Sequence, residues 1–496
     1  MGPSTIPQEN HEISGSEEQV ARIDILRGRS ILVILILLIG DILSIGFAFW
    51  LATEIRAALI PLIGGVIRWD IFLPLLELNL ISILITYTLT GLYPGFGRTA
   101  VEEMQQIFYS LTLGYGVLGI AIYFQKTGPE FPRFVFLAGW ALACLFNLIV
   151  RFTIRNRASL LKWWGTPVVV VGPITETCDV VEKLLRSRRL GLKPVLIVDK
   201  TAPSNQPNIL GLPVIQSPSH LQEVISRNPI QYAVYVEAPG DSHFETRAEL
   251  SWLSKFFPTV LVVLANSPLG SLWVRTMDLE GRLTLRAQYH LLDKKSTYLK
   301  RAFDVVLGIL LAVLALPLFI VIMVLIKLDS PGPAFHSNER LGLGGKRIRY
   351  LKFRTMSFDA EQRLEELLGR DPLVRQEYHK HHKLANDPRV TRMGKILRKF
   401  SLDELPQLWH VLQGEMSLVG PRAYLPSELK DMGTYADLIF QIRPGLTGWW
   451  QVMGRHATTF QHRLQLDEYY LSNWSLWLDI YILLKTGWVL LSGSGV

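Results

Sequence analysis

The most informative stretch of this chain is Ser401-Leu402-Asp403-Glu404-Leu405-Pro406-Gln407-Leu408-Trp409. Ser401 followed three residues later by Glu404 matches the capping-box pattern, with serine at the N-cap and glutamate at the third helical position. Asp403 is then expected in the first helical turn, where the positive end of the helix dipole favours an ionised carboxylate. An ionised carboxylate is also the form that acts as a nucleophile. The alternative is an acidic pair that only caps a surface helix.

Cations surround this acidic pair along the sequence. The turn Gly420-Pro421-Arg422 follows it, and the basic residues before it are Arg389, Arg392, Lys395, Arg398 and Lys399. Arginine forks suit bidentate contacts with phosphate groups. A simple helix cap does not account for so many cations, so this region predicts a site for a multiply charged phosphate ester.

The composition indicates a membrane protein of two or three domains. The chain has 496 residues, 49% of them hydrophobic, and a formal net charge of +8, and its mean hydropathy is +0.25. Such a charge suits an anionic membrane surface, a phosphate substrate or nucleic acid, and of these partners we expect no nucleic acid. Cys144 and Cys178 are the only cysteines, which excludes a disulfide framework and a cysteine-type zinc site.

Four apolar runs follow a polar tail at residues 1–28: they cover residues 31–52, 71–93, 107–124 and 134–150. Each is close to the length that crosses the hydrocarbon core, which predicts four transmembrane helices within residues 29–155. Arginines precede the first run and follow the fourth, so the positive-inside rule predicts both ends in the cytoplasm. For Asp41 and Glu77, which lie inside two of the runs, we expect interhelical hydrogen bonds or a place at the membrane interface.

Residues 160–290 alternate strand-like and helix-like segments, which predicts a Rossmann-like cytosolic domain. Strands are expected at 168–171, 195–198, 232–236 and 259–263, and a helix at 176–187. Gly172 is followed by none of the further glycines of a dinucleotide fingerprint. We therefore favour a structural or dimerising role for this domain over nucleotide binding.

A fifth apolar run, at residues 303–328, has a different character. Lys300 and Arg301 precede it, Lys327 and Arg340 lie at or beyond its end, and Pro317 interrupts it. Basic residues on both sides conflict with a simple crossing of the membrane, and a mid-run proline can break a helix. We expect a re-entrant helix that breaks at Pro317 and returns to the same leaflet; a fifth full span is the alternative.

Seven segments make residues 297–496 resemble the bacterial sugar transferase family, the monotopic polyprenyl-phosphate phosphoglycosyl transferases. They are Lys300-Arg301-Ala302-Phe303-Asp304, Tyr350-Leu351-Lys352-Phe353-Arg354-Thr355-Met356, Asn386-Asp387-Pro388-Arg389-Val390-Thr391, the stretch 401–408, Ser417-Leu418-Val419-Gly420-Pro421-Arg422, Arg443-Pro444-Gly445-Leu446-Thr447-Gly448-Trp449-Trp450-Gln451-Val452 and Asn473-Trp474-Ser475-Leu476-Trp477-Leu478-Asp479. Two positions depart from the family pattern: Leu316 replaces a serine before Pro317, and Ala423 replaces a proline after Arg422.

The resemblance implies an α/β membrane protein with a four-helix transmembrane bundle, a Rossmann-like cytosolic domain and a mostly helical monotopic catalytic domain. Its implied partners are a UDP-hexose, undecaprenyl phosphate, membrane lipid and a second copy of the chain in a homodimer. Its implied place is the bacterial inner membrane, with the catalytic domain on the cytoplasmic face. The implied reaction gives undecaprenyl-diphosphate-hexose and UMP, the first membrane step of O-antigen, capsule or exopolysaccharide synthesis. Galactose is the expected sugar and glucose the alternative.

The resemblance also assigns roles to residues. Asp403 matches the nucleophile that forms a covalent phosphosugar intermediate, and Glu404 matches its partner, which helps hold Mg²⁺. The matched substrate- or phosphate-binding residues are Arg340, Lys352, Arg354, Arg398, Arg422, Arg443 and Asp479. For each of these cations, the alternative is an interfacial role on anionic lipid. For Asp479, the alternative is a structural role as an ion-pair partner.

Three other interpretations fit the sequence less well. The histidines at 379, 381 and 382 are interleaved with lysines, which favours a solvated helix face over a metal site. A nucleotide-sugar epimerase or dehydratase would need the missing glycine fingerprint. A non-catalytic scaffold for polysaccharide assembly would not need an intact Asp403-Glu404 pair with its arginines.

Overall fold

The computed structural model describes residues 30–491 except 65–68, 126–131, 201–207, 217–220, 223, 226–229, 238–248, 265–273, 280–281, 288–290, 292, 371–374, 376–386 and 455–457. The predicted N-terminal tail and the three histidines at 379–382 lie outside the described residues. The chain forms two compact units, one ending at residue 267 and the other beginning at residue 268.

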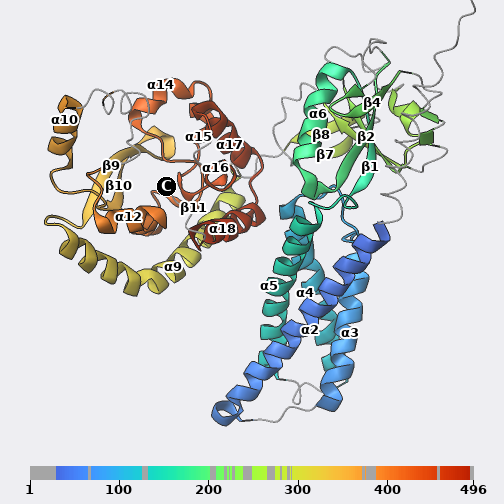
Figure 1. The fold of residues 1–496 in the computed structure, drawn as a ribbon. Coiled ribbons are helices and arrows are strands. Elements are labelled where there is room, and N and C mark those ends of the chain that lie inside the picture. Colours follow the sequence, from blue (N-terminus) through green and yellow to red (C-terminus); the bar gives the residue numbers. More distant parts are fainter. Residues whose placement is uncertain are drawn as a thin grey trace, which may run out of the picture. The chain divides into compact units, whose positions relative to one another are not determined.

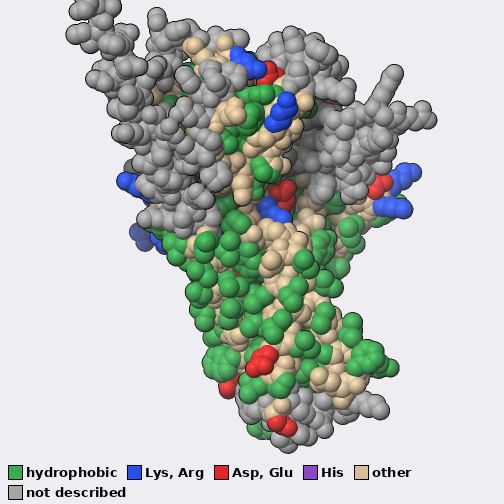
Figure 2. Space-filling model, turned by 90° about the vertical axis from the view of Figure 1, so that its right-hand side faces the viewer, with side chains coloured by type: hydrophobic (Ala, Val, Ile, Leu, Met, Phe, Trp, Pro, Cys, Tyr) green, Lys and Arg blue, Asp and Glu red, His purple; other side chains and the backbone are tan. Residues whose placement is uncertain are grey.

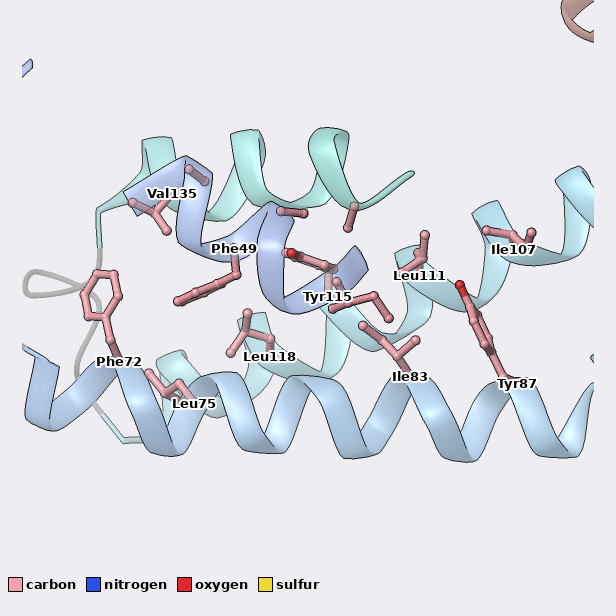
Figure 3. Packing of buried hydrophobic residues seen from close by; sticks show 14 of the residues in the cluster. Phe49, Phe72, Leu75, Ile83, Tyr87, Ile107, Leu111, Tyr115, Leu118 and Val135 are labelled. Carbon is pink, nitrogen blue, oxygen red and sulfur yellow. The ribbon is translucent and has the colours of Figure 1, made fainter. Parts of the chain in front are cut away.

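The first unit starts with four long helices (Figure 1): α2 (Ser30–Ile63), α3 (Trp69–Leu89), α4 (Ala100–Phe124) and α5 (Arg133–Ala158). All four contain apolar segments long enough to span a membrane, which agrees with the four predicted runs. Aromatic and aliphatic side chains from these helices interlock in a shared core, including Phe49, Phe72 and Tyr115 (Figure 3). Hydrophobic side chains also cover much of the outer face over the helices (Figure 2). A helix bundle that is apolar inside and outside is typical of a lipid environment.

Asp41 makes the interhelical contacts that its position inside an apolar run predicts. It is fully buried and accepts two hydrogen bonds from Arg151 of α5, at 2.8 Å from Nε and 2.6 Å from Nη2. The amide of Asn147 donates to the same carboxylate at 2.9 Å. Glu77, in contrast, is exposed on α3. A buried ion pair of this geometry fixes the register of α2 against α5.

A second buried acid joins the helices to the domain that follows them. Glu103 of α4 accepts a hydrogen bond from Arg155 Nε at 2.6 Å and lies 3.3 Å from Nη2 of Arg189, which belongs to the short helix η1 (Arg188–Leu190) of the α/β domain. Trp164 donates its indole N–H to the Arg188 carbonyl at 2.9 Å. These contacts make the helices and the α/β domain parts of one unit.

The α/β domain contains a six-stranded sheet in the order β3-β4-β2-β1-β5-β6. Its elements are β1 (Thr166–Val171), α6 (Ile174–Arg186), β2 (Leu192–Val198), β3 (Asn208–Ile209), β4 (Leu212–Ile215), β5 (Tyr232–Val236) and β6 (Thr259–Val263). All pairings are parallel except that of β3 with β4. Alternate valines of β1 enter the cores on the two faces of the sheet, as expected for a central parallel strand. All four predicted strands and the predicted helix are confirmed.

The second unit combines a long helix with a small, mostly helical domain. Its elements are β7 (Val274–Leu279), β8 (Arg282–Ala287), α9 (Lys294–Asp329), β9 (Phe335–Leu341), η3 (Leu343–Gly345), β10 (Arg347–Phe353), α10 (Ala360–Arg370), α12 (Arg392–Lys399), η4 (Leu402–Gln407), α13 (Leu408–Gln413), β11 (Ser417–Val419), η5 (Pro426–Glu428), α14 (Leu429–Met432), α15 (Tyr435–Ile439), β12 (Gly445–Thr447), α16 (Trp449–Met453), α17 (Phe460–Ser472) and α18 (Leu476–Leu491). The strands form three two-stranded sheets: β7 with β8, β9 with β10, and β11 with β12.

Helix α9 differs from the prediction of a break at Pro317. It runs as one helix of 36 residues with Pro317 inside, and its ribbon curves along its length (Figure 1). Proline removes one backbone hydrogen bond and crowds the preceding turn, which bends a helix without ending it when the flanking turns remain intact. The expected interruption is therefore a bend.

Helix α9 is held to the rest of its unit by a buried ionic network. Lys300 Nζ lies 3.0 Å from Asp304 Oδ1 and 2.9 Å from Asp479 Oδ2 of α18. Asp304 also accepts hydrogen bonds from Ser417 Oγ at 2.7 Å and from the Leu418 amide at 3.2 Å. The lysine and both acids are buried, so α9, β11 and α18 meet at one point.

We expect Asp41→Ala to destabilise the first unit by about 3–5 kcal/mol, because it leaves the Arg151 guanidinium buried without its main partner. The midpoint of thermal unfolding of the full chain in detergent would report the loss. Asp179→Ala is the control, since it breaks an ion pair on α6 whose two side chains are 63% and 73% exposed. Equal midpoints for the two variants would contradict a structural role for Asp41.

Candidate active site

Asp403 and Glu404 lie in η4, a short 3-10 helix, and the predicted capping box is wrong. Ser401 adopts a left-handed backbone conformation with φ of 54°, and its side chain makes no capping hydrogen bond. The chain leaves α12 at Phe400 and reverses at Ser401, so that the Ser401 carbonyl, not its hydroxyl, accepts from the Glu404 amide at 3.4 Å. Asp403 is thus positioned by a tight turn, without the dipole of a full α-helix.

Lys352 of β10 is the cation closest to the acidic pair. Its Nζ lies 2.6 Å from Glu404 Oε1 and 3.6 Å from Asp403 Oδ2. The structure therefore brings together three of the residues that the family resemblance assigned. Arg398 is also nearby, since its charge acts on Asp403, and its Nε donates to Thr355 Oγ1 at 3.0 Å.

Burial raises the pKa of the Asp403 carboxyl above its ordinary value. The positive charge of Lys352 lowers that pKa, the negative charge of Glu404 raises it, and Arg398 lowers it. The net direction is upward, which is opposite to the effect expected from a helix dipole. The charge of Lys352 thus favours the ionised form of this half-buried carboxylate.

A strip of arginines continues from the acidic pair. Arg340 packs over the Tyr350 ring at 5.7 Å, and the guanidinium groups of Arg422 and Arg463 lie 5.6 Å and 4.7 Å from the Trp450 ring. Burial and the nearby charge of Arg422 lower the pKa of both Arg340 and Arg463. Like charges held this close favour an anion between them.

Three nitrogen atoms in this strip lack a partner. They are Arg340 Nε, Arg463 Nε and the indole Nε1 of Trp450, which are buried and have no hydrogen bond within the described part of the chain. Buried donors without partners are costly, and a bound anion would satisfy them. A phosphate or diphosphate group carries the charge and the acceptor oxygens that would satisfy these three donors.

Asp467 of α17 positions Arg422. Its Oδ2 accepts a hydrogen bond from the Arg422 amide at 3.1 Å and from the Tyr424 hydroxyl at 2.7 Å. Asp467 is completely buried, and this burial raises the pKa of its carboxyl to about 7. The turn that carries Arg422 thus depends on a buried acid one helical turn after Arg463.

Three predicted site residues lie in structural contacts away from the acidic pair. Arg354 donates to the carbonyls of Ser330 and Pro331, both at 2.7 Å, just after the end of α9. Arg443 Nε donates to the Gly414 carbonyl at 2.7 Å. Asp479 is fully buried against Lys300, with further hydrogen bonds from nearby aromatic residues. Arg354 and Arg443 therefore donate hydrogen bonds to backbone carbonyls, and Asp479 balances the charge of buried Lys300.

Arg463 is the residue that sequence reasoning missed. It lies on α17, outside the seven segments quoted in the sequence analysis. It comes four residues before Asp467, on the same face of the helix. The four-residue spacing of Arg463 and Asp467 could have indicated a functional site. On a helix, however, an arginine and an aspartate at this spacing usually form a surface ion pair.

The acidic pair would fit a Mg²⁺ site completed by substrate. Mg²⁺ binds through one or two carboxylates together with substrate phosphates and water. Glu404 would supply such a carboxylate beside the arginine strip. Within the described residues, no group of three or more His, Cys, Asp or Glu side chains forms a protein-only metal site. Glu404 would hold the ion, and the ion would neutralise charge on a diphosphate.

Acids and cations arranged in this way, in a unit that carries a long apolar helix, define a membrane-associated enzyme that transfers phosphate esters. Comparison with known proteins agrees. Residues 295–493 match the family model described as bacterial sugar transferase, and residues 88–236 match one described as a CoA-binding domain.

Relatives match over most of the chain. It is 33% identical over 395 residues to the undecaprenyl-phosphate galactose phosphotransferase of Salmonella typhimurium, covering 79% of this chain and 82% of that protein. The UDP-galactose-lipid carrier transferase of Erwinia amylovora is 30% identical over 399 residues, with the same coverage. The UDP-glucose:undecaprenyl-phosphate glucose-1-phosphate transferase of Escherichia coli is 38% identical over 368 residues, covering 71% of this chain and 74% of that protein. The chain belongs to the bacterial sugar transferase family.

The α/β domain does not fit the ligand in its family description. A pyrophosphate in such a sheet binds at the N-terminus of the helix after β1. Here Pro173 occupies the N-cap of α6, and the Asp199 carboxylate accepts the hydrogen bond of the Ile174 amide at 2.9 Å. An acid thus occupies the place that a phosphate would take at this helix N-terminus.

We expect Arg463→Gln to weaken binding of inorganic pyrophosphate about tenfold, because it removes one charge-assisted contact. Calorimetric titration of the full chain in detergent would measure the affinity. Lys395→Gln is the control, since it removes the same charge from an exposed position on α12. Equal weakening by both variants would mean that net charge alone binds the anion.

The raised pKa of Asp467 predicts a pH-dependent stability. The folded protein holds this proton up to about pH 7, whereas the unfolded chain releases it near the ordinary value of 3.8. The stability contribution of Asp467 is therefore greatest at low pH, falls as the pH rises to about 7, and is constant above that. The thermal midpoint of the wild type should fall between pH 5 and 7 relative to Asp467→Asn. Parallel midpoint curves for the two proteins would contradict this assignment.

Proposed function

We propose that this enzyme transfers hexose 1-phosphate from a UDP-hexose to undecaprenyl phosphate, giving undecaprenyl-diphosphate-hexose and UMP. The observation that carries the proposal is the contact of Lys352 with both Asp403 and Glu404 beside the arginine strip. Two of the relatives described above have galactose in their names and one has glucose. We propose galactose as the sugar, with glucose as the alternative.

The proposed chemistry has two displacements at one phosphorus atom. An Asp403 carboxylate oxygen attacks the phosphorus next to the sugar, and the bond from that phosphorus to the oxygen of UMP breaks. The resulting aspartyl phosphosugar is then attacked by a phosphate oxygen of undecaprenyl phosphate, which frees Asp403. One diphosphate is broken and one is made, so the exchange is close to balanced in free energy. Splitting the transfer into two steps is the usual benefit of a covalent intermediate.

The remaining residues of the site bind the charged groups of the substrate and neutralise their charge. Arg340, Arg422 and Arg463 bind the diphosphate of the donor, and Lys352 lowers the pKa of Asp403 toward the ionised form. Mg²⁺ bound by Glu404 would stabilise the negative charge on the leaving UMP. Phosphoryl transfer requires little beyond this positioning and charge neutralisation.

We propose that α2–α5 cross the bacterial inner membrane and that α9 is re-entrant, with the catalytic unit on the cytoplasmic face. Lysines lie near both ends of this helix, Pro317 lies inside it, and its ribbon curves along its length (Figure 1). Basic flanks at both ends favour a helix whose two ends remain at one membrane surface.

We also propose a homodimer that forms through the α/β domain. The supporting observation is β6, an edge strand of the sheet that exposes Leu261 and Val262. Exposed apolar edge strands are sites of pairing between chains. Crosslinking of the full chain in native-like lipid tests this, and recovery of monomer alone would refute it.

We expect Asp403→Asn to abolish UMP release from the UDP-hexose in membranes that contain undecaprenyl phosphate and Mg²⁺. An amide is a poor nucleophile and cannot form the aspartyl phosphosugar. A panel of UDP-sugars measured with the wild type identifies the hexose, and Lys395→Gln serves as the active control. Full UMP release by Asp403→Asn would exclude this residue as the nucleophile.

A further inference from the structure

His410 of α13 is a buried histidine that has a partner at each ring nitrogen. The backbone amide of Leu351 in β10 lies 3.3 Å from Nε2, and a carboxylate oxygen of Glu415 lies 2.7 Å from Nδ1. Because a backbone N–H only donates, Nε2 must accept, and the proton of the neutral ring is then on Nδ1, where it is donated to Glu415. The two contacts together therefore require the neutral imidazole in a single tautomer.

A tight turn brings Glu415 to this ring. Helix α13 ends at Gly414, whose backbone is left-handed with φ of 87°. The carbonyl of His410 accepts hydrogen bonds from the amides of Glu415 and Met416 at 3.0 and 3.1 Å, so the chain folds back over the last turn of the helix. The side chain of Glu415 is 44% exposed, whereas that of His410 is 9% exposed. One ring nitrogen thus faces the edge of the unit and the other faces its interior.

The bond at Nε2 holds the strand that carries Lys352. Strand β10 pairs only with β9 in a two-stranded sheet, and such a ribbon is marginally stable by itself. The Leu351 amide donates to His410 instead of to β9, and the Leu351 side chain lines an apolar pocket together with Leu405 of η4. Lys352 is the next residue of the strand. Its contact with the acidic pair therefore depends on how β10 is held against α13 and η4.

Protonation of His410 removes this bond. An imidazolium ring carries an N–H on both nitrogens, so Nε2 no longer accepts, and it then faces the Leu351 N–H donor to donor. A part-buried amide without an acceptor is unfavourable, so the strand is displaced toward another partner. Because the attraction between charges falls with distance, a displaced Lys352 stabilises the ionised carboxylate of Asp403 less well.

Charges of both signs surround the ring. The carboxylate of Glu415 favours protonation, whereas the guanidinium of Arg301, which donates to the Val411 and Leu412 carbonyls at 2.6 and 2.8 Å, opposes it. The elements packed against α13 bring further ionisable side chains, which are Lys300 and Asp304 of α9, Asp403 and Glu404 of η4, and Tyr350 and Lys352 of β10.

We propose that His410 is a positioning residue for Lys352, an inference that rests on the proposed function. The neutral imidazole fixes β10 so that the Lys352 ammonium reaches both acids, and protonation of the imidazole releases the strand. Histidine side chains change charge between about pH 5 and 8, so this device acts near neutral pH. Protonation of Asp403 also slows the reaction in acid, so the test has to separate the two groups.

The pH profile of the first displacement separates them. Exchange of labelled UMP into the UDP-hexose by the full chain needs no acceptor and reports formation of the covalent intermediate. Between pH 7.5 and 5.5 we expect the exchange rate of the wild type to fall about fivefold more than that of His410→Gln, because the glutamine carbonyl accepts from Leu351 at every pH. At pH 7.5 the two rates should agree within about threefold. Parallel profiles would overturn the proposal.

His336→Gln is the matched control. His336 lies opposite Lys352 on β9 and is exposed, and its ring contacts Asn338 at 2.8 Å, not the backbone of β10. Its replacement removes a titrating ring from the same sheet and should leave the profile of the wild type unchanged. If His336→Gln flattened the profile as much as His410→Gln, the assignment to His410 would be wrong.

Glu415→Gln decides the matter if His410→Gln does not fold. The glutamine keeps an acceptor for the Nδ1 proton and removes the negative charge that favours protonation of the ring. The fall in exchange rate should then begin about 0.5 pH unit lower than in the wild type, as expected for the loss of one partly exposed charge. A profile identical to that of the wild type would overturn the proposal.

Deuterium exchange measures the contact without any substrate. At pH 7.5 the β10 peptide of His410→Ala should take up about one deuteron more than that of the wild type at short labelling times, because the Leu351 amide has lost its acceptor. Equal uptake would overturn the proposal. If the uptake differs as expected but the wild type exchanges UMP into no UDP-hexose, the proposed function fails, and with it the catalytic role of His410, while its bond to β10 stands.

Discussion

The catalytic unit depends on one buried lysine. Lys300 lies between Asp304 of its own helix and Asp479 of α18, and both acids accept further hydrogen bonds from buried donors. A charge buried at this depth is tolerated only when it is paired and hydrogen-bonded in full, so the surrounding elements have little freedom to shift. The long apolar helix α9 is thereby tied to the polar part of its unit through three side chains.

That network also fixes the turn that carries Arg422. Asp304 binds Ser417 and the Leu418 amide, which set β11 in place, and β11 pairs with β12 just before the turn. The backbones are so close at Gly420 that an added Cβ would lie 2.7 Å from the Arg443 carbonyl oxygen. Asp467 then holds the Arg422 amide from the other side. The position of Arg422 is thus traced back to an ion pair in helix α9.

Sequence reasoning was most successful where a single physical rule determines the structure. The valine run at β1 must be a buried strand, and the apolar runs must be long helices. It failed at Ser401, because a capping pattern does not reveal that the backbone is left-handed there. For Asp479 the sequence left open a substrate-binding role and a structural ion pair, and its contact with buried Lys300 supports the ion pair. Arg463 was missed because its neighbours Arg422 and Trp450 come from distant segments.

The 3-10 helix η4 has consequences for the order of events. Its acids face the cations of the polar site, while Leu405 and Pro406 on the same six-residue helix line an apolar pocket. In the proposed reaction, the carboxylate of Asp403 would therefore stand at the boundary between water and lipid. A water-borne donor and a lipid-borne acceptor would reach it from different phases, so neither would block the path of the other. The proposed covalent intermediate would carry the phosphosugar across that boundary without either substrate having to change solvent.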